Sequence, residues 1–523
     1  MRSRYRIGML TLLAASFSIL LLFYAYGRIQ LVDDAYIFLR YAHNLARGDG
    51  YVYNAGAPVE GTTSVLWTLS LAAADRLGLP LERATEALSL AAELAILACL
   101  WLKLYRERFA LAAATVALAA PALSQPWRLA IMMGLETGLY ALLLLALLLA
   151  LPWRSSQRLR TLGLGAIGAL LFLTRPEAAL TLALVLLWLV VFRTGRGRGA
   201  RVLGLALIWV AAIAAVTTWR LLAFGEVVPN SVIAKSVPLG SLLDQAALWP
   251  RLRAGFDYLR DWAAASWPQL ALALAGLLVL LRQNRALAGL LVAMIAPTAV
   301  VAVVNAGDWM PYYRLLAPLL PLAAVPGAIA VHAALGSRWL DQRRAGARAA
   351  ALLGALVVGA SALACVAAFA RLEPRRAFDR SSGPYMPCYT AVGEALAPYL
   401  GPSALIAPES IGKIGYILPD TRVHDFFGLV DAHIAHYGQM PFPEFTFGRF
   451  DYRYTIDQRP DLFVFHSPYH FASLNAVGYA QRYQTYRLVE PRCELMVGIA
   501  DGEVERLLPP LRRAFAVEPM DSQ

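Results

Sequence analysis

The stretch GLETGLYALLLLALLLALPWRSSQRLR, residues 134–160, contains the pattern that decides the fold: an apolar run followed by a basic cluster. A helix needs about 20 mostly apolar residues to cross a bilayer, and the run at 135–152 comes close to that length. Arginines directly after such a run are typical of the cytoplasmic side of a membrane. The stretch therefore predicts a transmembrane helix that ends inside the cell.

The same pattern recurs along residues 1–370 and predicts a polytopic α-helical membrane protein. Of the 523 residues, 59% are hydrophobic and only 16% are charged, against about 25% charged residues in a soluble domain. We expect about eleven transmembrane helices, because each crossing needs one such run. Their predicted ranges are 7–26, 83–102, 109–124, 135–152, 161–174, 178–192, 202–223, 264–281, 286–304, 315–335 and 349–370.

The basic clusters predict how the chain is oriented in an inner membrane. They all lie inside only if residues 27–82 stay wholly outside. The run at 62–80 carries Asp75 and Arg76, which argue against a full span. No small-residue cleavage site follows the first run, which predicts an uncleaved helix and a cytoplasmic N-terminus. The clusters are residues 103–108, 152–160, 193–201, 282–285 and 337–348.

The net charge of +12 has two readings, nucleic-acid binding or cytoplasmic loop charge. Residues 371–523 hold 15 Lys/Arg and 18 Asp/Glu, a net charge of −3, so the remainder carries +15. Because the excess lies in loops between apolar runs, we expect no nucleic-acid partner. The bilayer itself is the expected partner of these loops.

Residues 371–523 predict a small periplasmic α/β domain after a transmembrane domain at 1–370. Residues 403–408 and 461–468 are apolar and bounded by turn residues, which is typical of buried strands, and 388–400 predicts a helix. Cys388 and Cys493 both fall in this region. A disulfide between them is permitted in an oxidising compartment.

The outer loops carry the chemically varied residues, and the first of them carries paired acids. Asp33 and Asp34 follow the first helix closely, and two carboxylates at a membrane face are costly unless they are solvated, paired or bound to a cation. Nearby tyrosines, Tyr36 among them, offer aromatic surface for stacking on sugars. The alternative is a solvated loop with an interfacial aromatic belt.

Seven segments resemble the GT-C glycosyltransferases, and most closely the mycobacterial terminal arabinofuranosyltransferases and related bacterial pilin arabinosyltransferases. They occur in order from about residue 30 to residue 431, and no similarity is recognised beyond that point. The segments are residues 33–69, 134–143, 174–180, 224–235, 306–318, 408–420 and 426–431.

The resemblance implies a transmembrane GT-C catalytic domain that transfers a sugar, D-arabinofuranose by family, from a polyprenyl-phosphate donor. The acceptor is a hydroxyl of a cell-envelope glycan or an exported protein. Asp33, the first acid of the motif, is the expected catalytic base. Asp34 would orient the acceptor or, with Asp33, hold a divalent cation such as Mg²⁺, Mn²⁺ or Ca²⁺. No nucleotide cofactor is expected.

Cations near the leaving phosphate should stabilise its charge. The candidates are Arg40, Arg175, Lys235, Arg314 and Lys413, for each of which the alternative is an interfacial residue whose head reaches toward water. The residues expected to contact sugar or acceptor are Tyr36, Glu60, Asn230, Asp308, Trp309 and Glu409. For Glu136 and Glu177 we favour pairing with basic groups between helices.

Two other functions compete with sugar transfer: a transporter or flippase of lipid-linked sugars, and an assembly or scaffold protein, which explains the hydrophobicity but not the loop motifs. A transporter or flippase should carry charged groups at mid-membrane. This sequence instead keeps its acids and aromatics at the outer ends of the helices, with Glu86 and Glu93 as the exceptions. A zinc site is conceivable around His424, His433 and His436, although an acceptor-binding or solvated loop fits them better. The Gly pattern at 163–168 lies in a predicted helix and indicates close helix packing rather than a dinucleotide site.

Overall fold

The computed structural model describes residues 2–26, 31–151, 158–192, 198–236, 245–336, 385–491 and 493–520. The chain divides into two compact units, and each combines segments that are far apart in the sequence. The helical unit comprises Met1–Gln30, Thr85–Val216 and Arg251–Arg376. The mixed unit comprises Leu31–Ala84, Thr217–Pro250 and Ala377–Gln523. The predicted helix at 349–370, the cluster at 337–348 and the predicted domain boundary at residue 370 lie outside the described residues.

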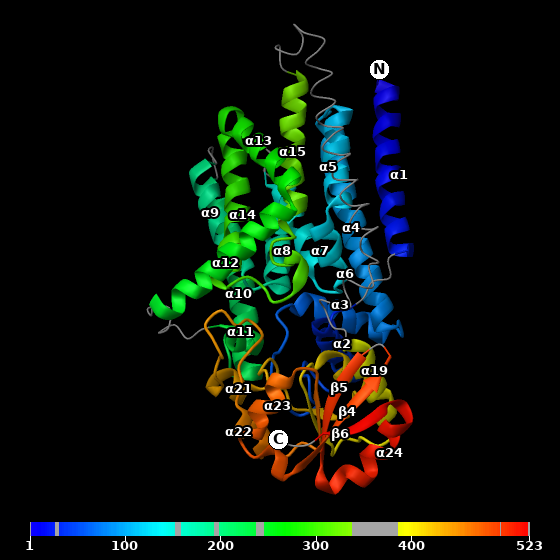
Figure 1. The fold of residues 1–523 in the computed structure, drawn as a ribbon. Helices are drawn as coiled ribbons and strands as arrows, with labels where there is room; N and C mark the ends of the chain where they lie inside the picture. Colours follow the sequence, from blue (N-terminus) through cyan, green and yellow to red (C-terminus); the bar gives the residue numbers. More distant parts are fainter. Residues whose placement is uncertain are drawn as a thin grey trace. The chain divides into compact units, whose positions relative to one another are not determined.

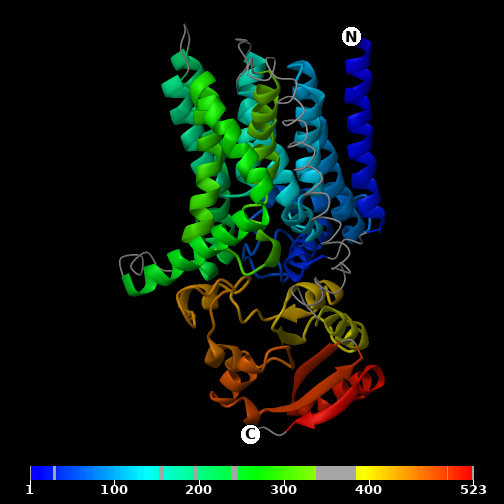
Figure 2. The same cartoon turned by 45° about the horizontal axis from the view of Figure 1, so that its top comes forward.

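The helical unit consists of apolar helices packed side by side (Figures 1 and 2). Each of the ten predicted transmembrane runs within the described ranges contains a helix. Helix α15 packs on both α13 and α5, and α9 packs on α14. The helices are α1 (Arg2–Tyr26), α4 (Leu81–Arg106), α5 (Leu111–Leu123), α6 (Gln125–Met132), α7 (Thr137–Ala150), α8 (Arg158–Thr174), α9 (Ala178–Phe192), α10 (Arg198–Phe224), α12 (Gln245–Ala265), α13 (Trp267–Gln283), α14 (Arg285–Val304), η2 (Pro311–Tyr313) and α15 (Leu319–Gly336).

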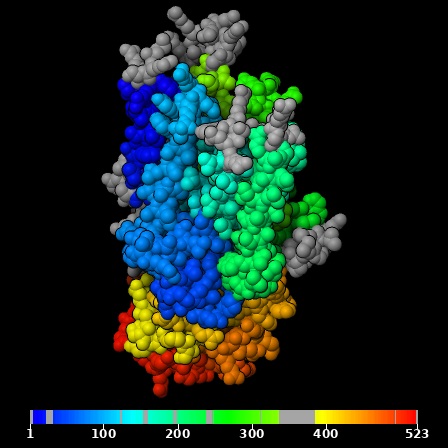
Figure 3. Space-filling view, turned by 180° about the vertical axis from the view of Figure 1, so that it is seen from behind, coloured from blue at the N-terminus to red at the C-terminus, as the bar shows by residue number. Residues whose placement is uncertain are grey.

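These helices make the protein a polytopic membrane protein, as predicted. Among the described residues, α4, α10 and α14 are each long and apolar enough to cross a bilayer, and α12 with α13 form a further candidate bent by 92°. Leu203, Leu207 and Val210 on α10 are each about 60% exposed. Side chains of α10 lie at the surface in Figure 3. An apolar surface of this kind suits lipid rather than water. The number of about eleven spans stays a prediction.

The mixed unit is built on a six-stranded sheet with strand order β2-β1-β3-β5-β4-β6. Strand β1 pairs in parallel with β2 and β3, and the remaining pairs are antiparallel. The strands are β1 (Leu405–Pro408), β2 (Arg422–Val423), β3 (Leu462–Phe465), β4 (Tyr483–Glu490), β5 (Cys493–Ala500) and β6 (Ala516–Met520). Sequence predicted β1 and β3 from their apolar runs and the α/β class of this region, but it missed the β4–β5 hairpin.

In the sequence of the mixed unit, helices precede, separate and follow the strands of the sheet. Those before the sheet are α2 (Asp33–Arg47), α3 (Val65–Arg76), α11 (Asn230–Lys235) and α19 (Met386–Leu396). Those between or after the strands are α20 (Gly412–Ile417), α21 (Ala432–Tyr437), α22 (Tyr452–Asp457), α23 (Pro468–Asn475), η3 (Tyr479–Gln481), η4 (Asp501–Glu503) and α24 (Val504–Ala514). Helix α19 is the helix predicted at 388–400. Cys388 on α19 is disulfide-bonded to Cys493 at the start of β5, which is the pair the sequence permitted.

Helix α2 holds the first loop in the mixed unit. It begins with Asp33 and Asp34, whose negative charges suit the positive end of a helix dipole. It ends at Gly48, which adopts a φ of +96° that favours glycine. Helix α2 packs on α3 and on α20. Helix α3 has 12 residues, about 18 Å of helix, and is too short to cross a bilayer alone.

Candidate active site

Asp33 lies in a backbone cradle at the start of α20. Its Oδ2 accepts the Gly412 amide N–H and its Oδ1 accepts the Lys413 amide N–H, both at 2.8 Å. A Cβ on residue 412 would overlap the backbone carbonyl of Asp33, so only glycine fits there. The cradle fixes the orientation of a carboxylate that is only 5% exposed.

The surroundings of Asp33 adjust its affinity for a proton. The pKa of Asp33 is raised to about 7, chiefly by burial. The two amide hydrogen bonds from Lys413 and Gly412 oppose this increase, and the nearby carboxylates of Asp34 and Asp425 add to it. Each carboxylate oxygen uses one lone pair on an amide and keeps a second one. Asp33 therefore has the pKa and the lone pairs that a general base needs near neutral pH.

Lys413 also carries an ammonium group, on the residue whose amide N–H binds Asp33. Its Nζ donates to the Tyr36 hydroxyl at 3.1 Å and to Glu82 at 3.0 Å, and it lies 4.1 Å from the centre of the Tyr36 ring. Tyr416 packs on Tyr36 with ring centres 5.5 Å apart. The lysine side chain is 15% exposed, while Glu82 is 45% exposed. An incoming anion could therefore replace Glu82 on Lys413 without opening the core.

Asp34 and Lys235 form the more accessible part of the same site. The Lys235 Nζ lies 3.9 Å from Asp34, and the two side chains are 27% and 17% exposed. Lys235 ends the short helix α11, as its basic last residue. We call Asp33, Asp34, Tyr36, Lys235 and Lys413 the paired-acid site. The structure thus brings together five residues that the sequence selected.

Arg40, by contrast, is an internal residue. It is 2% exposed, and its five N–H groups have five acceptors in the mixed unit. The acceptors are the carbonyls of Tyr53, Gly415, Leu418 and Thr421 and the side-chain oxygen of Asn54. No donor remains for a phosphate, so we leave Arg40 out of the site.

Glu60 and Asn230 hold loops of the mixed unit together. Glu60 accepts from Arg220 with both oxygens, at 2.7 and 3.1 Å, and both side chains are buried. The Asn230 side chain donates to the carbonyls of Gly428 and Leu429 at 2.8 and 3.1 Å. Its backbone N–H donates to the Glu60 carbonyl at 2.8 Å. Their expected contact with sugar or acceptor stays a prediction.

Glu409 also makes internal contacts. It is 5% exposed, and its Oε2 accepts the amide N–H groups of His466 and Ser467 at 2.7 and 2.8 Å. Its Oε1 lies 3.2 Å from the His466 Nε2 and 3.4 Å from the His470 Nε2. Burial raises the pKa of Glu409 to about 7.

The remaining candidates lie in the helical unit. Arg175 is buried and pairs with Glu136 at 2.8 Å, and its Nη1 lies 3.7 Å from Glu177, so the predicted pairing of both glutamates is confirmed. Within the described residues, that Nη1 has no hydrogen-bond partner. Arg314 pairs with Asp308, and it is close enough to Arg175 to repel it electrostatically.

The segment that carries Asp308, Trp309 and Arg314 has a strained backbone. Ala306, Tyr312 and Tyr313 adopt φ values of +59°, +71° and +58°, a region that non-glycine residues rarely occupy. Strain of this kind is retained where the surrounding structure requires it and is concentrated at functional sites. The segment therefore remains a candidate for donor contact.

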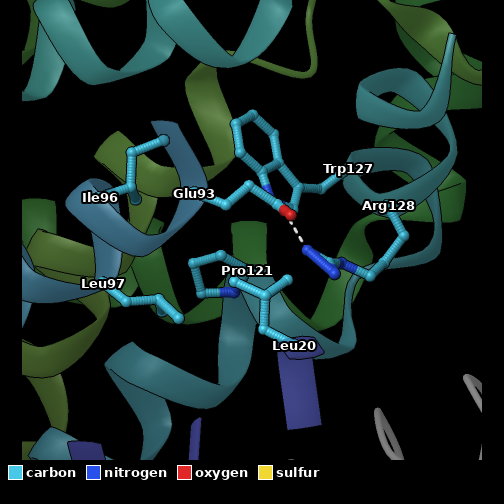
Figure 4. Close-up of a pocket in the computed structure, with 7 residues that line it drawn as sticks. All are labelled: Leu20, Glu93, Ile96, Leu97, Pro121, Trp127 and Arg128. Atoms are coloured by element: carbon cyan, nitrogen blue, oxygen red, sulfur yellow. Dashed lines mark hydrogen bonds and ion pairs between the residues drawn. The ribbon is translucent and has the colours of Figure 1, made fainter. Parts of the chain in front are cut away.

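Glu93, which sequence flagged as a mid-membrane acid, is paired within the helical unit. It accepts from the Trp127 indole N–H at 2.9 Å and forms a buried ion pair with Arg128 (Figure 4). Leu20, Ile96, Leu97 and Pro121 complete the lining of a small cavity there. Since an arginine neutralises the acid, the group fits interhelical bonding better than transport of a charged substrate.

The acids and histidines fit a metal poorly. Both Asp33 oxygens already accept amide N–H groups, and Asp34 faces the Lys235 ammonium. His424, His433 and His436 turn to different partners, Thr455, Asp451 and Glu226. Within the described ranges, Cys388, Glu490 and Cys493 are the one group of three closely spaced ligand atoms, and its cysteines are in the disulfide.

Sequence reasoning missed two charged residues that bind the candidates, Glu82 and Arg220, and grouped a third, Asp425, with the histidines of residues 424–436 rather than with Asp33. Glu82 opens α4 and binds Lys413, Arg220 binds Glu60, and Asp425 accepts the amides of Phe427 and Val430. Asp425 lies two residues after β2, at the carboxyl end of a parallel strand. That position is where α/β sheets bind ligands, and it was the available signal.

Comparison with solved structures identifies the class of fold. ArnT from Cupriavidus metallidurans matches with a TM-score of 0.56 at 12% identity, over 94% of this chain and 97% of that chain. An Archaeoglobus fulgidus oligosaccharyltransferase, solved with Zn and sulfate, matches with a TM-score of 0.54 at 12% identity, over 92% and 72%. Both are GT-C glycosyltransferases, and this chain has the GT-C fold.

Sequence comparison gives a more particular relative. The chain is 31% identical over 358 residues to the terminal β-(1→2)-arabinofuranosyltransferase of Mycobacterium tuberculosis, over 59% of this chain and 53% of the relative. It therefore spans about half the length of that curated relative. The resemblance predicted from the seven segments is confirmed. Residues 380–505 match a family model described as a domain of unknown function, DUF8728.

Proposed function

We propose that the protein is a glycosyltransferase that moves D-arabinofuranose from a polyprenyl-phosphate donor to a hydroxyl of a cell-envelope glycan or an exported protein. Similarity to an arabinofuranosyltransferase and the GT-C fold support the reaction class. ArnT from Cupriavidus metallidurans has also been solved bound to undecaprenyl phosphate. The reaction takes place at the periplasmic face of the inner membrane.

One observation carries the proposal. The buried carboxylate of Asp33, which two amide N–H groups hold and whose pKa is raised to about 7, lies in one site with Lys235 and Lys413. Asp33 takes the proton of the acceptor hydroxyl as its oxygen attacks the anomeric carbon. The bond from that carbon to the phosphate oxygen breaks, and the electron pair leaves with the polyprenyl phosphate. Asp34 orients the acceptor. Lys235 and Lys413 offset the charge that develops on the phosphate.

The helical unit, taken by itself, holds separate candidates for donor contact. Arg175 keeps a buried Nη1 that lacks a hydrogen-bond partner among the described residues, and such a group favours an anionic ligand. Arg314 and Asp308 lie on the strained segment, and Trp309 offers an aromatic face for the sugar. In the mixed unit, Tyr36 offers an aromatic ring within the paired-acid site.

A transfer assay in detergent tests the function. Purified protein should consume synthetic polyprenyl-phosphate arabinofuranose and form a glycosylated acceptor, as followed by mass spectrometry. Asp33→Asn should lower turnover at least about 100-fold, because general bases contribute about 10²–10⁴-fold. The matched control is Asp420→Asn, an acid of the same unit whose side chain is 58% exposed.

Two outcomes would oppose the proposal. Normal turnover by Asp33→Asn would remove Asp33 from the mechanism. Donor that stays intact in detergent, yet crosses the bilayer in vesicles, would favour a flippase of lipid-linked sugars. Envelope glycans that lack a hexose rather than a pentose when the gene is deleted would replace arabinose but keep the transfer reaction.

A further inference from the structure

The parallel strands of the mixed unit meet at a topological switch point. The chain runs from β1 to β2 on one side and then returns to β3 on the other side of β1. In such sheets, the carboxyl ends of the two strands at the switch point leave a crevice where ligands usually bind. In this sheet, the corresponding position lies between the residues that follow Pro408 of β1 and Phe465 of β3.

A side chain of the protein occupies this position. Glu409 directly follows β1, and its Oε2 accepts two successive amide N–H groups directly after β3, those of His466 and Ser467. Its own N–H donates to the Val464 carbonyl of β3 at 2.8 Å. Hydrogen bonds to a carboxylate are roughly twice as strong as neutral ones. Glu409 thus ties the two strand ends together where a ligand would otherwise bind.

The loop that starts at Glu409 ends in the cradle of Asp33. Each residue on the way is anchored in the mixed unit: the Ser410 N–H donates to the Tyr389 hydroxyl at 3.3 Å, and the Ile411 carbonyl accepts the Tyr53 hydroxyl at 2.6 Å. The next two N–H groups, of Gly412 and Lys413, bind Asp33. The position of the cradle therefore depends on where this loop is fixed.

The two histidines that face Glu409 carry no charge at pH 7, so the two amide N–H groups are its strongest hydrogen-bond partners. The histidines are His466 and His470, with Tyr385 stacked on His466 at 3.8 Å and Tyr389 and Tyr452 at the two Nδ1 atoms. Burial lowers the pKa of His466 to about 3 and of His470 to about 4, so both rings are neutral at pH 7. The two contacts are hydrogen bonds between neutral rings and a carboxyl group rather than ion pairs.

We propose that Glu409 is a positioning residue, which fixes residues 409–413 so that the amides of Gly412 and Lys413 hold Asp33 in the geometry for proton abstraction. This role rests on the proposed function of Asp33. It differs from the sugar contact expected from the sequence, because the four contacts of the carboxylate are all internal.

Hydrogen exchange measured by mass spectrometry tests the structural half of the proposal without any need for activity. Glu409→Ala should raise amide exchange at least tenfold in peptides that cover 409–413 and the start of α2, with the rest of the mixed unit unchanged. Glu409→Gln keeps an oxygen that accepts both N–H groups and should restore protection. The control is Glu444→Gln, an exposed acid of the same unit. Unchanged exchange in Glu409→Ala, or exchange raised throughout the unit, would overturn the proposal.

A double-mutant cycle tests the catalytic half. Glu409→Ala should lower kcat at least tenfold and leave the KM for the acceptor within about twofold, because Asp34, which orients the acceptor, does not lie on this loop. In the Asp33→Asn background the same change should have little further effect, since residues that act as a unit are not additive. Equal losses in both backgrounds would show that Glu409 acts independently of Asp33. Inactive wild type with the predicted exchange pattern would reject the proposed function and keep the cradle.

Discussion

At the scale of single residues, Asp33 and Arg40 show how burial and unused hydrogen-bonding capacity decide whether a residue can act on a substrate. They lie on the same helix, and both are at most 5% exposed. All five N–H groups of Arg40 donate to protein oxygens. Each carboxylate oxygen of Asp33, by contrast, accepts one amide hydrogen bond and keeps a second lone pair. Only the aspartate can still exchange a proton with a substrate. Chemical type alone made both of them candidates.

The pKa of Asp33 predicts how transfer depends on pH. The base must be ionised to accept a proton, and burial raises its pKa to about 7. The rate should therefore fall about tenfold for each pH unit below the pKa and level off above it. The measurement is kcat/KM from pH 5 to 9 in detergent. Because Asp34 and Asp425 are coupled to Asp33, the midpoint belongs to the group of acids.

The Asp420→Asn enzyme is the control that distinguishes this decrease in rate at low pH from unfolding in acid. Asp420→Asn should keep the same profile, since Asp420 is exposed and its ion pair with Arg47 lies at the surface. A rate that is flat from pH 5 to 8 would mean that no group with a pKa near 7 is needed in its ionised form, which would remove Asp33 as the base.

The sequence found the paired acids but not their setting. Two adjacent acids after an apolar helix are a local signal, so Asp33 and Asp34 could be selected from the sequence. The partners of Asp33 are 379 and 380 residues away, and those of Arg40 are up to 381 residues away. No local pattern specifies such contacts, so an arginine near the acids was grouped with the phosphate ligands.

At the scale of elements, Arg40 connects α2 to the loop at 418–421 through hydrogen bonds. The carbonyls of Leu418 and Thr421 end on its guanidinium, while Arg47, two turns along α2, makes an exposed ion pair with Asp420. A buried carbonyl without a donor costs about 1–3 kcal/mol, while an exposed ion pair contributes about 0–1 kcal/mol. The two arginines therefore differ in importance for the fold.

We expect Arg40→Ala to destabilise the protein by about 3–5 kcal/mol, because several buried acceptors lose their donors at once. Arg47→Ala should cost at most about 1 kcal/mol. Thermal unfolding of both variants in the same detergent measures the difference. Arg40→Lys, with three donors, should lie between them. Equal melting temperatures for Arg40→Ala and Arg47→Ala would show that the five bonds do not support the fold.

Elements were predictable where their burial is uniform. Strands β1 and β3 are apolar throughout, and the long helices show unbroken apolar runs, so both kinds appear in the sequence. In β4, Tyr483, Thr485 and Tyr486 are buried while Gln484 and Arg487 are exposed, which mixes polar and apolar residues. Such an element depends on its neighbours in the sheet, and its sequence pattern is weak.

At the scale of the whole molecule, the chain builds each unit from segments that are not consecutive. The first loop and residues 217–250 belong to the same unit as the C-terminal region. The predicted domains at 1–370 and 371–523 stay a prediction, as does the orientation of the chain. Apolar runs record which residues leave water, but not which of the remaining segments associate.

The disulfide offers a test of that orientation. Cys388 and Cys493 lie in the mixed unit, and a disulfide persists in an oxidising compartment such as the periplasm. In spheroplasts of a Cys99→Ser, Cys365→Ser background, an impermeant maleimide should label the protein only after reduction. Cys388→Ser should free Cys493, which is partly exposed, and make it reactive without reduction. Because the bond joins residues that are 105 positions apart, the loop-entropy model predicts that this variant should also lose about 4–5 kcal/mol of stability.

The two halves of this measurement have separate meanings. A variant carrying both Cys388→Ser and Cys493→Ser sets the background of labelling. Labelling of Cys493 only after lysis of the spheroplasts would place the mixed unit in the cytoplasm. Asp33 belongs to the same unit, so the proposed base would then lie on the opposite side of the membrane from an exported acceptor. That outcome would remove transfer at the periplasmic face even if the purified enzyme used the donor, because substrate and base must share one compartment.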